Sequence, residues 1–84
     1  MTIEALRSLI LVKLADGRLP LNSIPRVWGG PGNGETCNAC EGIITQHEFV
    51  MEGISLAGGK APLQLHVGCF WIWEQERRPQ LAAR

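Results

Sequence analysis

The first apolar residues of the chain recur at the spacing of an α-helix. Intervals of three and four residues separate the members of one stripe, which are Ile3, Leu6, Ile10 and Leu14. Thr2 is suited to cap the first turn, and Asp16-Gly17 is suited to end the helix near Ala15. Other apolar residues, Leu9, Leu11 and Val12, spread beyond the stripe. We therefore expect this helix to bury more than one side, against the rest of the domain or against a second chain.

The pattern changes to an imperfect alternation of apolar and polar residues from Gln46 to Leu56, which predicts a strand. Leu63-Gln64-Leu65-His66 alternates in the same way, and Ala57-Gly58-Gly59-Lys60 between the two favours a turn. Together these segments predict a β-hairpin. A final helix is expected to begin near Val67 and to end before Pro79, because proline disrupts the hydrogen bonding of a helix interior.

Prolines and glycines interrupt any regular pattern between the first helix and the hairpin. Pro20 and Pro25 exclude a regular helix from residues 19–26, where we expect an extended connector. Gly29 to Gly34 is expected to be a flexible loop. Its glycine spacing resembles a phosphate-binding loop, but Glu35-Thr36 stands where that motif has Lys followed by Ser or Thr. A loop that leads to the first cysteine is therefore the favoured interpretation.

The length and the cysteine count both point to a metal. A chain of 84 residues forms one small domain, and domains of this size usually need a staple beyond their hydrophobic core. The chain has three cysteines, which cannot all pair in disulfides within it. A metal site that uses all three leaves no cysteine over.

The spacing of the cysteines and one histidine is that of a zinc site. Cys37 and Cys40 form a Cys-x2-Cys pair, and His66 and Cys69 form a His-x2-Cys pair. Two residues between ligands let one tight turn, or the first turn of a helix, direct both side chains at a single ion. Four protein ligands leave no open position for water or substrate, so we expect one structural Zn²⁺ and no catalysis. The predicted fold is a small zinc-stabilised α+β domain with N-terminal helix, zinc knuckle, β-hairpin and C-terminal helix.

Other readings of the same residues fit the sequence less well. Three buried cysteines with a satisfied histidine would not require both pairs to have ligand spacing. A redox Cys-x-x-Cys needs a strand before it and a helix after it, which the glycines from Gly29 to Gly34 and Gly42 oppose. Covalent haem attachment would require a histidine where Glu41 stands, and zinc deaminase chemistry would require a glutamate where Gly68 stands.

These motifs support a resemblance to known zinc proteins. Cys37-x2-Cys40 followed by His66-x2-Cys69-Phe70 resembles the first zinc half of a LIM domain and, more broadly, the treble-clef finger class, over about residues 36 to 78. The second cysteine pair of a LIM domain is missing, because Trp71-Ile72-Trp73-Glu74 follows instead. With Trp28-Gly29-Gly30 ahead of the knuckle, the pattern is also similar to small uncharacterised bacterial zinc-binding proteins. The resemblance implies zinc-ligand roles and a protein-interaction function, and no catalytic role.

Charge and the N-terminal segment bear on location and partners. Eight basic and eight acidic side chains balance, so strong nonspecific attraction to nucleic acid or to a membrane surface is not expected. Met1 to Ala15 carries Glu4 and Arg7, and its apolar run is too short for a signal peptide or a membrane span. We expect a cytoplasmic protein, in which paired thiols more often bind metal than form disulfides.

The last helix is expected to use its aromatic residues unequally. Phe70, Ile72 and Trp73 share the side of Cys69 and should form core, whereas Trp71 points away from the metal. We favour coverage of Trp71 by the N-terminal helix or by the Trp28 segment. The alternative is that Trp71 anchors a protein partner.

Three groups of polar residues resemble sites but have plainer interpretations. His47 is expected at the surface, Glu48 and Glu52 on the polar face of an exposed edge strand, and Arg77, Arg78 and Arg84 in a solvated tail. The predicted organisation is an N-terminal helix (1–18), a connector (19–36), a zinc-binding module (37–78) and a tail (79–84).

The functional prediction is a non-catalytic zinc module that acts as a protein-interaction adaptor or regulator, binding another protein or itself through Trp71 and the N-terminal helix. The alternative is a nucleic-acid-binding zinc finger that uses Arg77, Arg78 and the glycine-rich loop. A third possibility, an enzyme with Cys37 or Cys40 as nucleophile, predicts that these thiols react without removal of a metal.

Overall fold

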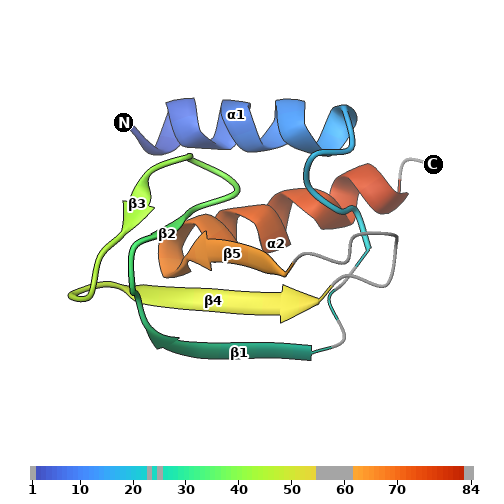
Figure 1. Cartoon of the computed structure of the whole chain (residues 1–84). Coiled ribbons are helices and arrows are strands. Elements are labelled where there is room, and N and C mark those ends of the chain that lie inside the picture. The colour runs from blue at the N-terminus through green and yellow to red at the C-terminus, as the bar shows by residue number, and fades with distance from the viewer. Residues whose placement is uncertain (1, 23, 25, 55–61, 83–84) are drawn as a thin grey trace.

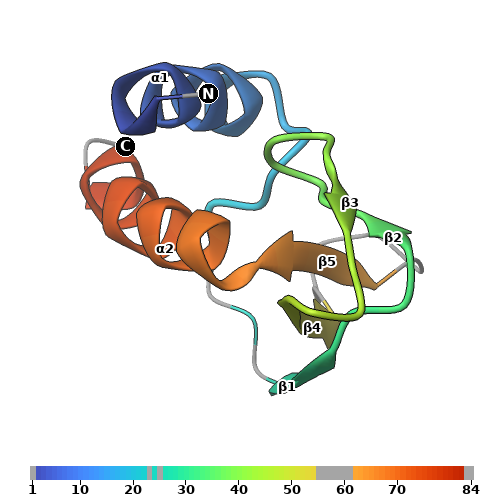
Figure 2. The same cartoon turned by 90° about the vertical axis from the view of Figure 1, so that its left-hand side faces the viewer.

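Two helices lie side by side in the computed structural model, which describes residues 2–22, 24, 26–54 and 62–82. Helix α1 (Ile3–Ala15) packs against helix α2 (Val67–Ala82), and the strands lie on one side of this pair (Figures 1 and 2). An ion pair between Arg7 and Glu76 joins the two helices. The α+β class with a helix at each end is as the sequence predicts.

The bounds of α1 follow from its capping residues, as predicted. The Thr2 hydroxyl accepts a hydrogen bond from the amide of Ala5 at 3.1 Å, which satisfies one of the unpaired donors of the first turn. At the other end Gly17 adopts φ +85°, the left-handed conformation that glycine tolerates best. Ile10 and Leu14 of the predicted stripe are buried, whereas Ile3 at its start is largely exposed.

A three-stranded antiparallel sheet contains the predicted hairpin as β4 (Phe49–Ile54) and β5 (Leu63–His66). The predicted turn Ala57–Lys60 and the end of the predicted strand at Leu56 lie outside the described residues. The third strand, β1 (Arg26–Pro31), pairs with β4, so the sheet order is β1-β4-β5. Strand β4 is therefore central, and the exposed edge predicted for it is wrong.

The glycine-rich segment is more ordered than the flexible loop predicted from its composition. Gly29 and Gly30 belong to β1, and the missing side chain of Gly29 leaves room for Met51, whose sulfur lies 3.3 Å from where a Cβ would be. Gly32 has still less space, because a Cβ there would lie 2.3 Å from the Thr45 carbonyl oxygen. These glycines permit close approach of neighbouring segments.

A second, short hairpin carries the first cysteine pair. It consists of β2 (Glu35–Thr36) and β3 (Ile43–Ile44), and the segment from Cys37 to Gly42 forms the knuckle between them. Asn38 ties this knuckle to the free edge of β5, because its amide donates to the Gln64 carbonyl and its side-chain oxygen accepts from the Gln64 amide. The two hairpins are thus fixed relative to each other beside the start of α2.

Helix α2 begins at Val67 as predicted but continues through Pro79 to Ala82. The predicted end before Pro79 is wrong. Proline at this position removes the amide that would donate to the carbonyl of Gln75. Both residues are exposed, so water can satisfy that carbonyl near the end of the helix.

The core lies where α1, α2, the knuckle and the sheet meet. Trp73 is its largest fully buried side chain, and its indole nitrogen donates to the Pro20 carbonyl at 2.8 Å. Arg77 covers Trp73, with the guanidinium carbon 5.3 Å from the ring centroid, and pairs with Glu74. Arg77 is only 7 % exposed, so its predicted place in a solvated tail is wrong.

Candidate metal centre

The four predicted ligands converge at the junction of three elements. Cys37 and Cys40 come from the knuckle, His66 ends β5, and Cys69 lies in the first turn of α2. Their ligand atoms all lie within 4.8 Å of one another. A tetrahedral zinc site with Zn–S bonds of about 2.3 Å has edges of about 3.8 Å, so a contraction of about 1 Å would let the cluster hold an ion. This convergence confirms the prediction that the four residues come close enough together to hold a metal ion.

The knuckle is a tight turn closed by its own backbone. The amide of Glu41 donates to the Cys37 carbonyl at 2.9 Å, and the amide of Cys37 donates to the Gly42 carbonyl at 2.8 Å. Glu41 takes the left-handed conformation, with φ +67°. Gly42 instead permits close approach to the ligands, because a Cβ there would lie 3.4 Å from the Cys40 sulfur and 3.8 Å from His66 Cε1.

Backbone amides surround the thiol sulfurs. The Gly42 amide donates to Cys40 Sγ at 3.4 Å, and the His66 amide donates to Cys37 Sγ at 3.5 Å. A hydrogen bond from the Cys69 side chain, reinforced by backbone amides, lowers the pKa of Cys37. The same bond and burial raise the pKa of Cys69. Cys37 is therefore the thiol of this pair that ionises first, and the thiolate is the form that binds a metal.

His66 presents one ring nitrogen to the sulfurs and the other to the surface. Its Nδ1 lies 3.3 Å from Cys40 Sγ and 4.0 Å from Cys69 Sγ. Its Nε2 lies 3.3 Å from the Ile43 carbonyl oxygen and 3.6 Å from a carboxylate oxygen of Glu48. Burial opposes protonation of the ring, but its contacts with Cys37, Ile43 and Glu48 raise the pKa of His66. This orientation makes Nδ1 the ligand atom and leaves Nε2–H to its outer partners.

Glu48 lies beside His66 of the cluster, a position that the sequence analysis did not predict. It lies just before β4, where the Thr45 amide donates to its carboxylate at 2.9 Å. This backbone hydrogen bond, followed by smaller contributions from the Thr45 side chain and His66, lowers the pKa of Glu48 against the effect of burial. The register of the hairpin accounts for the position of Glu48. Val50 pairs with His66, so the residues at the start of β4 lie beside this histidine.

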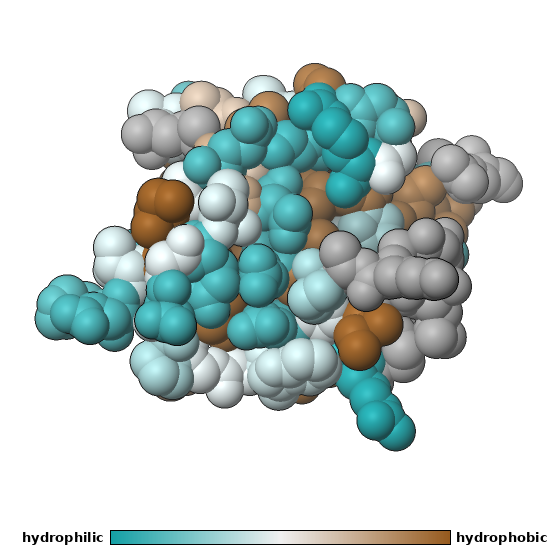
Figure 3. All heavy atoms as spheres, viewed as in Figure 1, coloured by the Kyte–Doolittle hydropathy of each residue, from teal (hydrophilic) through white to brown (hydrophobic). Residues whose placement is uncertain are grey.

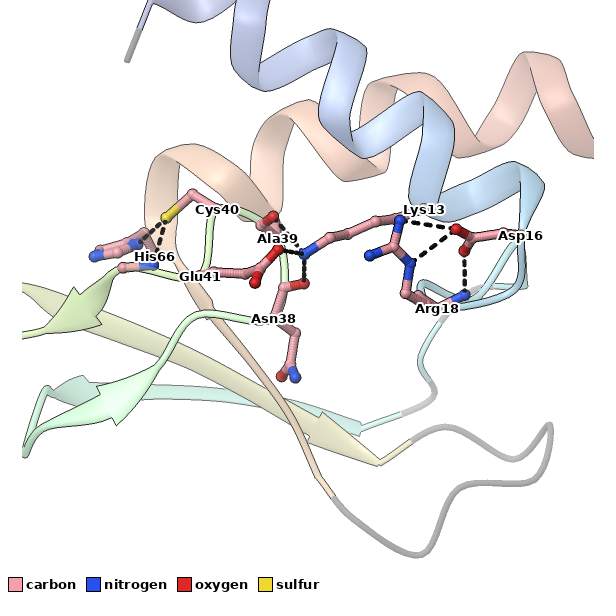
Figure 4. Close-up of polar contacts among 9 residues, drawn as sticks. Lys13, Asp16, Arg18, Asn38, Ala39, Cys40, Glu41 and His66 are labelled. Atoms are coloured by element: carbon pink, nitrogen blue, oxygen red, sulfur yellow. Dashed lines mark hydrogen bonds and ion pairs between the residues drawn. The ribbon is translucent and has the colours of Figure 1, made fainter.

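Lys13 is a second residue that the sequence analysis did not assign to the site. Its side chain is 4 % exposed, and its ammonium group reaches from α1 to the knuckle (Figure 4).

The other polar residues singled out in the sequence lie outside the cluster. His47 and Arg78 are exposed, and Glu52 is half-buried on β4. Arg84 lies outside the described residues.

Replacing Glu48 with glutamine should weaken metal binding. Glu48→Gln removes the carboxylate that faces His66 Nε2, and loss of such an outer partner typically lowers metal affinity by about 10-fold to 100-fold. We expect the lower end, because the Glu48 side chain is 47 % exposed. Competition between the protein and a chromophoric chelator for Zn²⁺ measures the change. Glu52→Gln is the matched control on β4, and equal affinity in both variants would contradict the role of Glu48.

Comparison of the chain with protein-family models, curated proteins and solved structures finds no match. No helix among the described residues is long and apolar enough to cross a membrane. Every buried side-chain nitrogen and oxygen within the described ranges has a hydrogen-bond partner. Among the described residues, Cys37, Cys40, His66 and Cys69 form the cluster whose side chains could hold a metal ion.

Proposed function

We propose that the chain is a non-catalytic module that binds one structural Zn²⁺ through Cys37, Cys40, His66 Nδ1 and Cys69. The observation that carries this proposal is the convergence of three sulfurs and one imidazole nitrogen from the knuckle, β5 and α2. Thiolates are soft ligands that favour zinc over magnesium, calcium or manganese. Four protein ligands complete a tetrahedron, so the ion serves the fold rather than a reaction.

The arrangement of elements supports a treble-clef-like interpretation of this module. A knuckle with two ligands is followed by a hairpin, and then by a helix whose first turn supplies the last ligand. The metal would join the knuckle, β5 and α2, which is the role of a structural zinc in a small domain.

Metal content tests the proposal directly. The protein purified without chelators should contain one zinc per chain by elemental analysis. Substitution with Co²⁺ should give the intense visible absorption of a tetrahedral site with thiolate ligands. A chain that contains no metal and takes up no Co²⁺ would overturn the proposal.

The adaptor role is the finer part of the proposal, and Trp71 supports it. Contrary to the coverage favoured from the sequence, Trp71 is 58 % exposed and makes an edge contact with Phe70. On α1, Ile3 and Val12 are also exposed. The face of the molecule seen in Figure 3 is largely hydrophilic, with hydrophobic side chains gathered at its margins. We therefore place protein binding, or self-association, on Trp71 and the exposed residues of α1.

Replacing Trp71 with alanine separates an interface role from a core role. We expect Trp71→Ala to change the free energy of unfolding by no more than about 0.5 kcal/mol, as for other exposed positions. The same change should weaken self-association measured by sedimentation, because large exposed aromatics dominate interface energetics. A large loss of stability in thermal unfolding would identify Trp71 as core and contradict the interface role.

The nucleic-acid alternative is weakened by the placement of its cations. Arg77 is buried and paired with Glu74, so it is not available to a phosphate. Arg78 is exposed but lies 3.9 Å from the same carboxylate. A neutral chain with so few free cations on this helix offers little electrostatic affinity for phosphates.

A further inference from the structure

A buried lysine connects α1 to the zinc knuckle. Lys13 Nζ donates to the carbonyl oxygens of Asn38 at 2.9 Å and Ala39 at 2.8 Å, and it forms an ion pair with Glu41 at 3.0 Å (Figure 4). An ammonium group has three hydrogens, so these three acceptors satisfy it completely. All three acceptors belong to the turn between Cys37 and Gly42.

The two peptide groups that accept from Lys13 lie between the two cysteines of the knuckle. The carbonyl of Asn38 shares its peptide plane with the amide of Ala39, and the carbonyl of Ala39 shares its plane with the amide of Cys40. Each of these peptide groups therefore has the Lys13 ammonium at its oxygen and its amide within the turn that joins the two thiols. A cation at the carbonyl oxygen polarises the peptide group as a whole.

The net charge of a zinc-loaded cluster favours a cation at this position. Three thiolates and one Zn²⁺ would leave one net negative charge, and Lys13 brings a positive charge to the far side of the knuckle, where Glu41 also pairs with it. A positive charge beside the turn that carries Cys37 and Cys40 favours their thiolate forms. The same acceptors stabilise the buried ammonium, which would otherwise be costly to remove from water.

We propose that Lys13 is an outer-sphere residue of the metal centre, through which metal binding and the docking of α1 stabilise each other. The inference rests on the proposed binding of zinc. Opening of the knuckle removes all three acceptors of Lys13, so its ammonium group must return to water and the second half of α1 must separate from the knuckle. Because coupling is reciprocal, an undocked α1 weakens metal binding by the same factor.

Lys13→Met tests this inference, because methionine keeps an unbranched side chain of similar volume without charge or donors. We expect zinc affinity, measured by chelator competition, to fall about 10-fold to 100-fold. In the Co²⁺-loaded protein the thiolate-to-metal charge-transfer band should move to lower energy, because the thiolates lose the nearby positive charge that stabilises them. Lys13→Gln keeps donors without the charge and should give an intermediate shift, and it serves as the readout if the methionine variant fails to fold.

Two controls separate this role from a general loss of stability. Leu6→Ala loosens α1 near its other end, so any fall in affinity should come without a change in the Co²⁺ spectrum. Arg18→Met removes an exposed cation paired with Asp16 and should change neither readout. This inference alone would be overturned if the wild-type protein takes up metal and both Lys13 variants show an unshifted Co²⁺ band. In that case the variants would also lose no more affinity than Leu6→Ala. A wild-type chain that takes up no metal would instead overturn the proposed function.

Discussion

Removal of the metal by an excess of a strong chelator should unfold the chain. In small zinc fingers, metal binding contributes on the order of 10 kcal/mol to folding, comparable to the entire stability of an ordinary small domain, about 5–15 kcal/mol. Here the four ligands join the knuckle, β5 and α2, and the knuckle in turn holds Lys13 of α1. Loss of the ion leaves buried thiols and a buried ammonium group in place of a closed site. The knuckle, β5, α2 and α1 are then each without one of their main attachments.

Far-ultraviolet circular dichroism and tryptophan fluorescence measure this change. Addition of chelator should abolish the helical signal and expose Trp73, and addition of Zn²⁺ should restore both. Cys69→Ser should show the chelated behaviour without chelator, because it removes a ligand from the first turn of α2. His47→Ala is the control, since His47 is exposed and lies outside the cluster. A chelated chain that keeps its helical signal and cooperative unfolding would contradict a structural role for the metal.

Trp73→Ala is the substitution outside the metal ligands with the largest expected effect. Trp73 is 1 % exposed, and truncation of such a residue costs about 3–5 kcal/mol through lost burial and the cavity that remains. Its neighbours also lose partners, because Arg77 lies over the ring and the Pro20 carbonyl accepts from the indole nitrogen. In a domain of this size the loss should bring the zinc-loaded protein close to unfolding at room temperature. Denaturant unfolding in the presence of Zn²⁺ measures it.

Two further variants make the Trp73 result interpretable. Trp73→Phe keeps most of the buried area and removes the hydrogen bond to Pro20, so it should cost less than Trp73→Ala while still leaving that carbonyl unpaired, about 1–3 kcal/mol. Trp71→Ala, two residues earlier on the same helix, removes an equal side chain from the surface. Similar losses of stability for Trp71→Ala and Trp73→Ala would contradict the division of α2 into a buried and an exposed face.

The parts of the fold that sequence analysis predicted correctly depend on short stretches of chain. Thr2 and Gly17 bound α1 because a capping hydroxyl and a left-handed φ act within one turn. Strands β4 and β5 follow from alternation of apolar residues. The ligands follow from two pairs with ligand spacing, in which a tight turn or a helix start already directs both side chains to one point.

The errors came from features whose meaning depends on distant residues. The glycines from Gly29 to Gly34 have a loop composition, but pairing with β4 makes a strand of the first two. Arg77 has the composition of a tail residue, but the ring of Trp73 and the carboxylate of Glu74 give it a buried position. Glu48 lacked any local signal, because only the register of the sheet brings it to His66.

The sequence by itself determined which two residue pairs form the Cys3His cluster, the ends of α1 and the start of α2, because each depends on the chemistry of residues within a few positions of one another. Only the tertiary structure decided that Trp71 is exposed rather than covered, and that Lys13 of α1 holds the carbonyls of Asn38 and Ala39. The physical reason is that burial and buried charge depend on which distant surfaces meet. A lysine at the edge of an apolar stripe has the same local pattern whether it ends in water or against a zinc knuckle.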